Sequence, residues 1–226
     1  MTAMAQPRPR SVTTAAADDA RRPGGPAPRG VVLGLVTAVW LLPFLEPAGP
    51  GNVTLSDLGL LVSILTTLSW ALRRQVRLGI PYAAGIGVLI VSGAVSGIVA
   101  GHAITALPLV QEVFLLAWAA AVANVTAGDP RARRIVLTSA VVSTTTWAGA
   151  MLAGLWLGIP SLSGVVEANG GRTAFRLGDP NLAGSYFVVG LALALATSTI
   201  RARWRLSMAA VLALAEVGVE RLTIAA

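Results

Sequence analysis

Two long stretches without any formally charged residue restrict the fold of this chain more than any other feature. They run from Leu78 to Gln111 and from Ile135 to Val166. Over the whole chain 12% of residues are charged and 55% are hydrophobic, whereas about 25% are charged in a typical soluble domain. So few charges cannot cover the surface of a water-soluble fold. The sequence therefore predicts an integral membrane protein and excludes an ordinary soluble enzyme.

The apolar runs divide into segments of the length that a membrane requires. A transmembrane helix needs about 20 mainly apolar residues, because the hydrocarbon core is roughly 30 Å thick. Divided at prolines, glycines and arginines, the chain is predicted to be an all-α polytopic helical bundle of roughly six to seven transmembrane helices. The predicted spans are 30–45, 53–72, 80–100, 107–127, 135–158, 181–200 and 206–219, with an outer loop at 159–180. Because Glu216 and Glu220 interrupt the last span, we expect it to be short.

The first 29 residues differ in composition from the rest. Residues 1–29 contain five arginines, two aspartates and five prolines, so they cannot bury enough apolar surface to offset the cost of ordering. We expect a disordered tail at 1–29 and one transmembrane domain at 30–226. A cleaved signal peptide is the alternative for the first apolar run, but the long preceding segment and the later spans favour an uncleaved helix.

The arginines indicate the orientation of the predicted bundle. The tail and the loops after the second, fourth and sixth spans together hold 14 of the 17 arginines. Since cytoplasmic loops accumulate positive charge, the amino terminus is expected in the cytoplasm. The same distribution explains the net charge of +7 without a nucleic-acid partner. The other side keeps only Arg172, Arg176 and Arg221.

Small and polar residues inside the spans predict helix packing. Span 80–100 and its end carry Gly93, Gly97 and Gly101, and span 135–158 carries a similar face at Gly154 and Gly158. Such faces let helices approach closely, within the bundle or across a homodimer. The hydroxyl cluster at 143–146 is expected to bond to its own backbone.

Few residues could carry catalysis or hold a metal. The chain has no cysteine and a single histidine, His102, so no metal site or metal cofactor is predicted. Glu112 is the only acid well inside a long apolar stretch. A carboxylate in lipid is costly, so Glu112 either faces a cavity or extends to the nearby interface.

The outer loop combines features of an anion site. One helical turn would place Arg172 and Arg176 on the same side, and guanidinium groups bind phosphate oxygens through forked, charge-assisted hydrogen bonds. Asp179 followed by Pro180 is typical of an N-cap and a first-turn proline, so the sixth span should begin there with its positive dipole end facing outward. These features predict an anion site at the outer membrane–water boundary; the alternative is a solvated loop whose arginines bind lipid phosphates.

Residues 172–186, RTAFRLGDPNLAGSY, resemble a motif of the O-antigen ligase / O-antigen polymerase-like membrane proteins. In that family an Arg, an aromatic residue and a Gly precede an Asn/Asp-Pro-Asn, here Asp179, Pro180 and Asn181, which opens a helix containing a small residue and a Tyr. The resemblance implies transfer of a glycan from an undecaprenyl-diphosphate carrier to an acceptor glycan, without a metal, on the outer face of the bacterial cytoplasmic membrane. Arg172 would contact the diphosphate and Arg176 would assist.

The chain also departs from this family. Relatives are longer and carry a large outer loop that supplies the expected catalytic His and a second Arg. His102 precedes the motif and does not correspond to that residue, so no catalytic residue is assigned. We therefore expect the amino-terminal part of such a protein, truncated or frame-shifted. A transporter or permease fragment and a non-catalytic membrane protein remain the alternatives.

Overall fold

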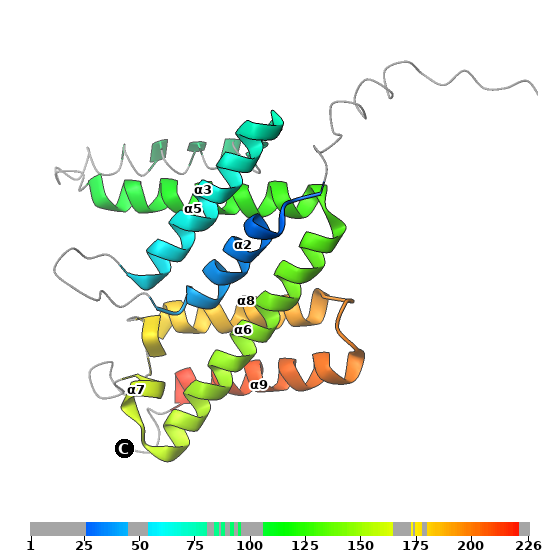
Figure 1. The fold of residues 1–226 in the computed structure, drawn as a ribbon. Helices are drawn as coiled ribbons and strands as arrows, with labels where there is room; N and C mark the ends of the chain where they lie inside the picture. Colours follow the sequence, from blue (N-terminus) through cyan, green and yellow to red (C-terminus); the bar gives the residue numbers. More distant parts are fainter. Residues whose placement is uncertain are drawn as a thin grey trace, which may run out of the picture.

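The computed structural model describes a part of the chain in which every element is a helix. The described residues are 26–44, 54–80, 84–85, 87–88, 91–92, 95, 106–164, 173, 175–177 and 180–221. Within them the elements are α2 (Arg29–Leu41), α3 (Leu55–Arg74), α5 (Ala106–Gly128), α6 (Pro130–Leu157), α7 (Pro160–Ser163), the 3-10 helix η2 (Phe175–Leu177), α8 (Pro180–Ala196) and α9 (Ala202–Arg221) (Figure 1). The all-α prediction is confirmed for this part of the chain. The predicted tail and most of the predicted span 80–100 lie outside the described residues.

Local capping explains where the helices begin and end. The Thr54 hydroxyl accepts a hydrogen bond from the Asp57 N–H at 3.2 Å while the Asp57 carboxylate accepts one from the Thr54 N–H at 2.8 Å, so a capping box starts α3. Asp129 is the N-cap of α6, and its carboxylate accepts hydrogen bonds from the N–H groups of Arg131 and Ala132. Gly158 ends α6 at a φ of 66°, a left-handed conformation that glycine adopts without strain.

Several helices begin or end at other residues than the predicted spans do, and three of these differences have a physical reason. Helix α6 begins at Pro130 rather than 135, because the Asp129 cap and a proline at the first position suit a helix start even though arginines follow. Helix α2 ends at Leu41 instead of 45, two residues before Pro43. Helix α9 runs from Ala202 to Arg221 without a break at Glu216. Its glutamates interrupt the apolar composition of the segment but not its backbone hydrogen bonding.

Two helices of the described part are long and apolar enough to cross a membrane by length and composition. They are α3 and α6. Along α3, a row of large apolar side chains is exposed at helical spacing: Leu55, Leu58, Leu61, Val62, Leu65, Leu68 and Leu72. Exposed apolar rows of this kind mark a surface that contacts lipid or another protein.

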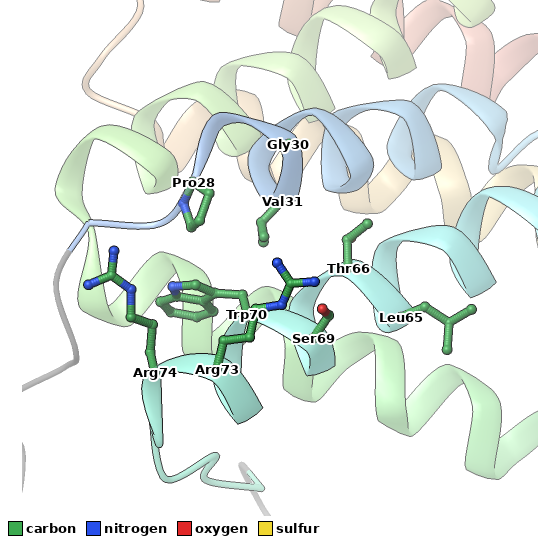
Figure 2. A pocket seen from close by; sticks show the side chains of 9 residues that line it. All are labelled: Pro28, Gly30, Val31, Leu65, Thr66, Ser69, Trp70, Arg73 and Arg74. Carbon is green, nitrogen blue, oxygen red and sulfur yellow. The ribbon is translucent and has the colours of Figure 1, made fainter.

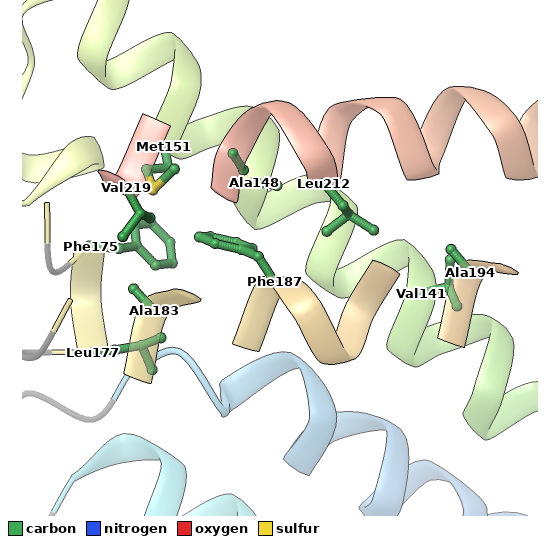
Figure 3. Packing of buried hydrophobic residues seen from close by; sticks show 11 residues of the cluster. Val141, Ala148, Met151, Phe175, Leu177, Ala183, Phe187, Ala194, Leu212 and Val219 are labelled. Carbon is green, nitrogen blue, oxygen red and sulfur yellow. The ribbon is translucent and has the colours of Figure 1, made fainter. Parts of the chain in front are cut away.

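Helix α6 lies between two groups of helices (Figure 1). On one side α2 packs against α3 and α6, and α5 packs against α3 and α6; on the other, α8 and α9 pack side by side and both contact α6. Each group has a buried apolar cluster. One surrounds Trp70 and Val125, and the other surrounds Phe175, Phe187 and Leu212 (Figure 3).

Small hydroxyl residues in the middle of α6 allow both groups to approach closely. Ser139 accepts a hydrogen bond from the Trp40 indole at 3.0 Å, and the Ser143 hydroxyl donates to the Val39 carbonyl of α2 at 3.4 Å. Thr144, Thr145 and Thr146 instead donate to carbonyls of α6. The prediction of backbone bonding is thus confirmed for the threonines, whereas Ser143 bonds across to a neighbouring helix.

On the opposite side, Gly190 of α8 lies directly against Thr144. A Cβ added at Gly190 would meet the Thr144 Oγ1 at 2.7 Å and its Cβ at 2.8 Å, distances that real side chains do not tolerate. Gly190 is therefore a packing residue, because only a hydrogen leaves room for the α6 threonine.

Replacing Gly190→Ala is expected to lower the free energy of unfolding by about 1–3 kcal/mol, since Thr144 cannot move away without losing its backbone bond. Gly149→Ala is the matched control, because no atom beyond its chain neighbours and the nearby backbone of α6 lies within 4 Å of the added Cβ and Ala is the better helix former by about 1 kcal/mol. Unfolding followed by circular dichroism in detergent measures both. Equal effects of the two changes would contradict the packing role.

Candidate functional site

The segment between α7 and α8 is anchored by a buried aromatic residue. Phe175 is 2% exposed and has a φ of 50°, in the left-handed region that a bulky residue rarely adopts. Its ring centroid lies 6.1 Å from that of Trp147 on α6 and 5.9 Å from that of Phe187 on α8. Figure 3 shows the Phe175 and Phe187 rings side by side in the core. Burial of the ring in this cluster offsets the unfavourable backbone conformation.

Hydrogen bonds join Thr173, just before η2, to the end of α7. The buried Thr173 hydroxyl donates to the Ser163 carbonyl and accepts from the Phe175 N–H at 3.2 Å. Gly164, at the end of α7, has a φ of 84°, and a Cβ there would lie 2.7 Å from the Phe175 carbonyl oxygen. Gly154 of α6 is equally close to α7, with Leu162 at 2.7 Å from an added Cβ. The row of small residues predicted on α6 therefore contacts α7 at Gly154.

Arg176 connects η2 and α7 to Phe44, three residues after the end of α2. Its guanidinium carbon lies 5.1 Å from the centroid of the Phe44 ring, and its Nη2 donates to the Ser161 carbonyl at 3.0 Å. The Phe44 ring in turn meets Trp147 edge-on, with 5.1 Å between centroids. A half-buried arginine thus ends a continuous row of rings formed by Phe44, Trp147, Phe175 and Phe187.

The predicted pair of outer arginines lies only partly within the described residues. Arg172 and Asp179 lie outside the described residues. Thr173 belongs to no helix and Phe175 has a positive φ, so the expected single helical turn from 172 to 176 is wrong. The burial of the Phe175 ring requires this departure from helical backbone.

The structure shows a helix where the sequence predicts the sixth span. Helix α8 begins at Pro180, and Asn181 is exposed in its first turn. The helix ends at Ala196, before the predicted residue 200. Glu112 lies within α5, and the surroundings of its side chain lie outside the described residues. No group of three potential metal ligands occurs among the residues that the structure describes.

Sequence reasoning missed Glu216 as a component of this region. Its carboxylate lies against α8, with Oε1 at 3.1 Å from the position of a Cβ added at Gly184. The residue follows the buried face of α9 that Leu212 and Ala215 form. That spacing of Leu212 and Glu216, one helical turn, was the signal available in the sequence. The sequence analysis treated Glu216 only as an interruption of the apolar segment, and that interpretation does not indicate its place beside α8.

Described arginines lie near both ends of α2, and the length of this helix gives the distance between them. Arg73 and Arg74 lie beside the start of α2, where they line a cavity with Gly30, whereas Arg176 lies over Phe44, beyond the end of α2. The helix has 13 residues, which corresponds to a length of roughly 20 Å. Arg176 is therefore separated from the arginine-rich end by about the length of this helix.

A buried acid organises the arginine-rich end. Asp129 accepts hydrogen bonds from the N–H groups of Ala132 at 3.2 Å and Arg131 at 2.8 Å, and from that of Ala27 at 3.2 Å. The bond from Ala132 is the main cause that lowers the pKa of Asp129 below its ordinary 3.8, and those from Arg131 and Ala27 add to it against the opposing effect of burial. The ionised carboxylate thus fastens the segment before α2 to the start of α6.

Comparisons with known proteins add no assignment to this geometry: no family model, curated protein or solved structure matches the chain. The site therefore rests on its own residues, namely the Arg176–Phe44 contact, the Phe175 anchor and the start of α8.

Changing Arg176→Gln is expected to loosen α7 and η2, because it removes both the contact with the Phe44 ring and the bond to Ser161. A desolvated cation–ring contact contributes about 1–2 kcal/mol, so amide hydrogen exchange in 160–164 and 175–177 should become roughly five- to thirtyfold faster. Arg203→Gln is the matched control, since Arg203 lies over the adjacent Trp204 of its own helix at 5.7 Å. Unchanged exchange in the Arg176 variant would refute the connecting role.

Proposed function

We propose that this chain is a polytopic protein of the bacterial cytoplasmic membrane that binds an undecaprenyl-diphosphate-linked glycan and takes part in its transfer to an acceptor glycan. In this proposal the amino terminus is cytoplasmic and the α7–η2 segment faces outward. The motif at 172–186 carries the assignment. Its best structural support is that Arg176 lies just before the start of α8, at the other end of α2 from the arginine-rich cavity.

The exposed surface of the described helices supports the membrane part of the proposal. The exposed apolar row on α3 suits contact with lipid chains, and α3 and α6 have the length and composition of spans. Arginine in the hydrocarbon core is costly. No arginine lies in the middle of α3 or α6: Arg73 and Arg74 end α3, and the arginines of α6 all lie in its first five residues, as helices embedded in lipid require.

The chemistry of the donor explains why guanidinium groups are needed. In transfer from an isoprenoid carrier the diphosphate is the leaving group, so its negative charge increases as the glycosidic bond breaks. A positioned cation stabilises that charge more than it stabilises the bound donor. We assign this contact to Arg172, with Arg176 assisting. The contacts of Arg176 with Phe44 and Ser161 hold its guanidinium in a fixed position, which lowers the cost of binding an anion there.

The orientation is testable by labelling, because the chain contains no cysteine. Ser161→Cys introduces a thiol beside Arg176, and Thr199→Cys introduces one near the arginine-rich end; both positions are exposed. A membrane-impermeant maleimide added to intact spheroplasts should label the Ser161 variant and reach the Thr199 variant only after permeabilisation. The reverse pattern would overturn the proposed topology and with it the outward-facing donor site.

The donor site is testable by binding to the full chain in proteoliposomes, with labelled undecaprenyl-diphosphate glycan as the probe. Arg172→Ala should weaken binding roughly 10- to 100-fold, because a charge-assisted hydrogen bond to phosphate contributes about 1.5–3 kcal/mol. Arg203→Ala on α9 removes the same charge from the opposite side and should leave binding unchanged. Equal binding by both variants would remove the assignment, provided that both insert as the wild type does.

A further inference from the structure

The arginine-rich end contains a cavity of about 530 Å³ between the start of α2 and the end of α3. Its lining combines two cations with apolar and hydroxyl groups: Pro28, Gly30, Val31, Leu65, Thr66, Ser69, Trp70, Arg73 and Arg74. No acidic residue is among these lining residues. Figure 2 shows the Trp70 ring between the side chains of Arg73 and Arg74. The cavity is thus positively charged at one end and apolar along its floor.

We propose that this cavity binds the phosphate headgroup of an anionic glycerophospholipid from the adjoining leaflet. The inference rests on the membrane placement in the proposed function, and it does not depend on glycan transfer. Arginine side chains bind phosphate oxygens in a forked manner, and clustered arginines at the cytoplasmic side of a bundle attract anionic lipids. Arg73 and Arg74 are exposed, and neither guanidinium makes a hydrogen bond or ion pair within the described residues.

The start of α2 contributes a second favourable group. Pro28 occupies its N-cap without a side-chain hydrogen bond, and the first turn contains no acidic residue. The first N–H groups of a helix carry a partial positive charge that favours an anion. Gly30, in this first turn, lines the cavity and has open space where a side chain would lie. The absence of a side chain at Gly30 leaves this end of the cavity open for the headgroup.

The shape of the neighbouring surface favours a lipid over a small soluble anion. Leu65, which lines the cavity, belongs to the exposed apolar row that continues along α3. An acyl chain attached to a phosphate held by Arg73 and Arg74 can follow this row. Trp70 lies at the boundary between the charged and apolar parts, where tryptophan is enriched in membrane proteins.

A comparison within the molecule shows why this cavity is the better candidate. On the other side of α2, a cavity of about 500 Å³ contains Arg29 and Arg131 but also Asp129. Its carboxylate would repel a phosphate, and its oxygens already bind three backbone N–H groups. The cavity between α2 and α3 lacks such an opposing charge among its lining residues.

The test is a titration of the purified full chain with phosphatidylglycerol, followed by native mass spectrometry, with phosphatidylcholine and inorganic phosphate as separate probes. The wild type should retain phosphatidylglycerol in preference to phosphatidylcholine. The double change Arg73→Gln with Arg74→Gln should weaken this binding roughly 25-fold, or about fivefold for each arginine. Arg203→Gln with Arg205→Gln removes the same charge elsewhere and should change binding less than twofold.

A second variant tests the cavity itself without changing any charge. Gly30→Leu should fill the cavity and weaken phosphatidylglycerol binding about tenfold, whereas Gly149→Leu, also placed in open space, should not. Full binding by the Gly30 variant, or equal losses in the two double-arginine variants, would overturn the proposal. Competition by inorganic phosphate at equal concentration would also overturn it, because the ligand would then be a soluble anion.

Failure of this inference is distinguishable from failure of the proposed function. Arg172→Ala should bind phosphatidylglycerol as the wild type does, and the Arg73/Arg74 double variant should still bind the undecaprenyl-linked donor. Loss of lipid binding in the Arg172 variant would overturn the location of the lipid site. Loss of donor binding in the double variant would show that these two arginines serve the donor instead.

Discussion

The close packing of α2 and α8 against the middle of α6 holds the two helical groups together. On the α2 side, hydrogen bonds of Ser139 and Ser143 join the helices. On the α8 side, Gly190 has no side chain and therefore lets α8 lie directly against Thr144. Small residues allow helix backbones to approach closely. Short hydroxyl side chains form hydrogen bonds with their own helix or with the neighbouring one. Both devices occupy adjacent turns of α6, so α6 serves as a common support for otherwise separate groups.

The aromatic row extends this support to the segment between α7 and α8. Phe175 adopts an unfavourable backbone conformation because its ring completes the row between Trp147 and Phe187. Arg176 is then directed toward Phe44, at the end of α2. The position of this arginine is therefore decided by core packing, which is a rigid way to present a cation beside the start of α8.

The arginines at the two ends are held differently. Arg176 has a ring and a carbonyl as partners, whereas Arg73 and Arg74 line an open cavity and make no hydrogen bond or ion pair within the part of the chain that the structure describes. A guanidinium that protein contacts hold in place can position a bound anion, whereas an exposed guanidinium without such contacts can turn toward an anion and attract it. The proposed donor site and the proposed lipid site depend on these two kinds of arginine.

The sequence by itself determined the helical class, the apolar character of the helices and several of their ends. Gly158 and Pro180 mark predicted boundaries because helix-end conformation and the place of a first-turn proline are local properties, which depend on a few neighbouring residues. The contact of Arg176 with Phe44, the position of Glu216 beside Gly184 and the cavity between α2 and α3 were decided only by the tertiary structure. Each joins residues from different helices, and hydropathy and spacing along one segment contain no information about which face of another segment will lie against it.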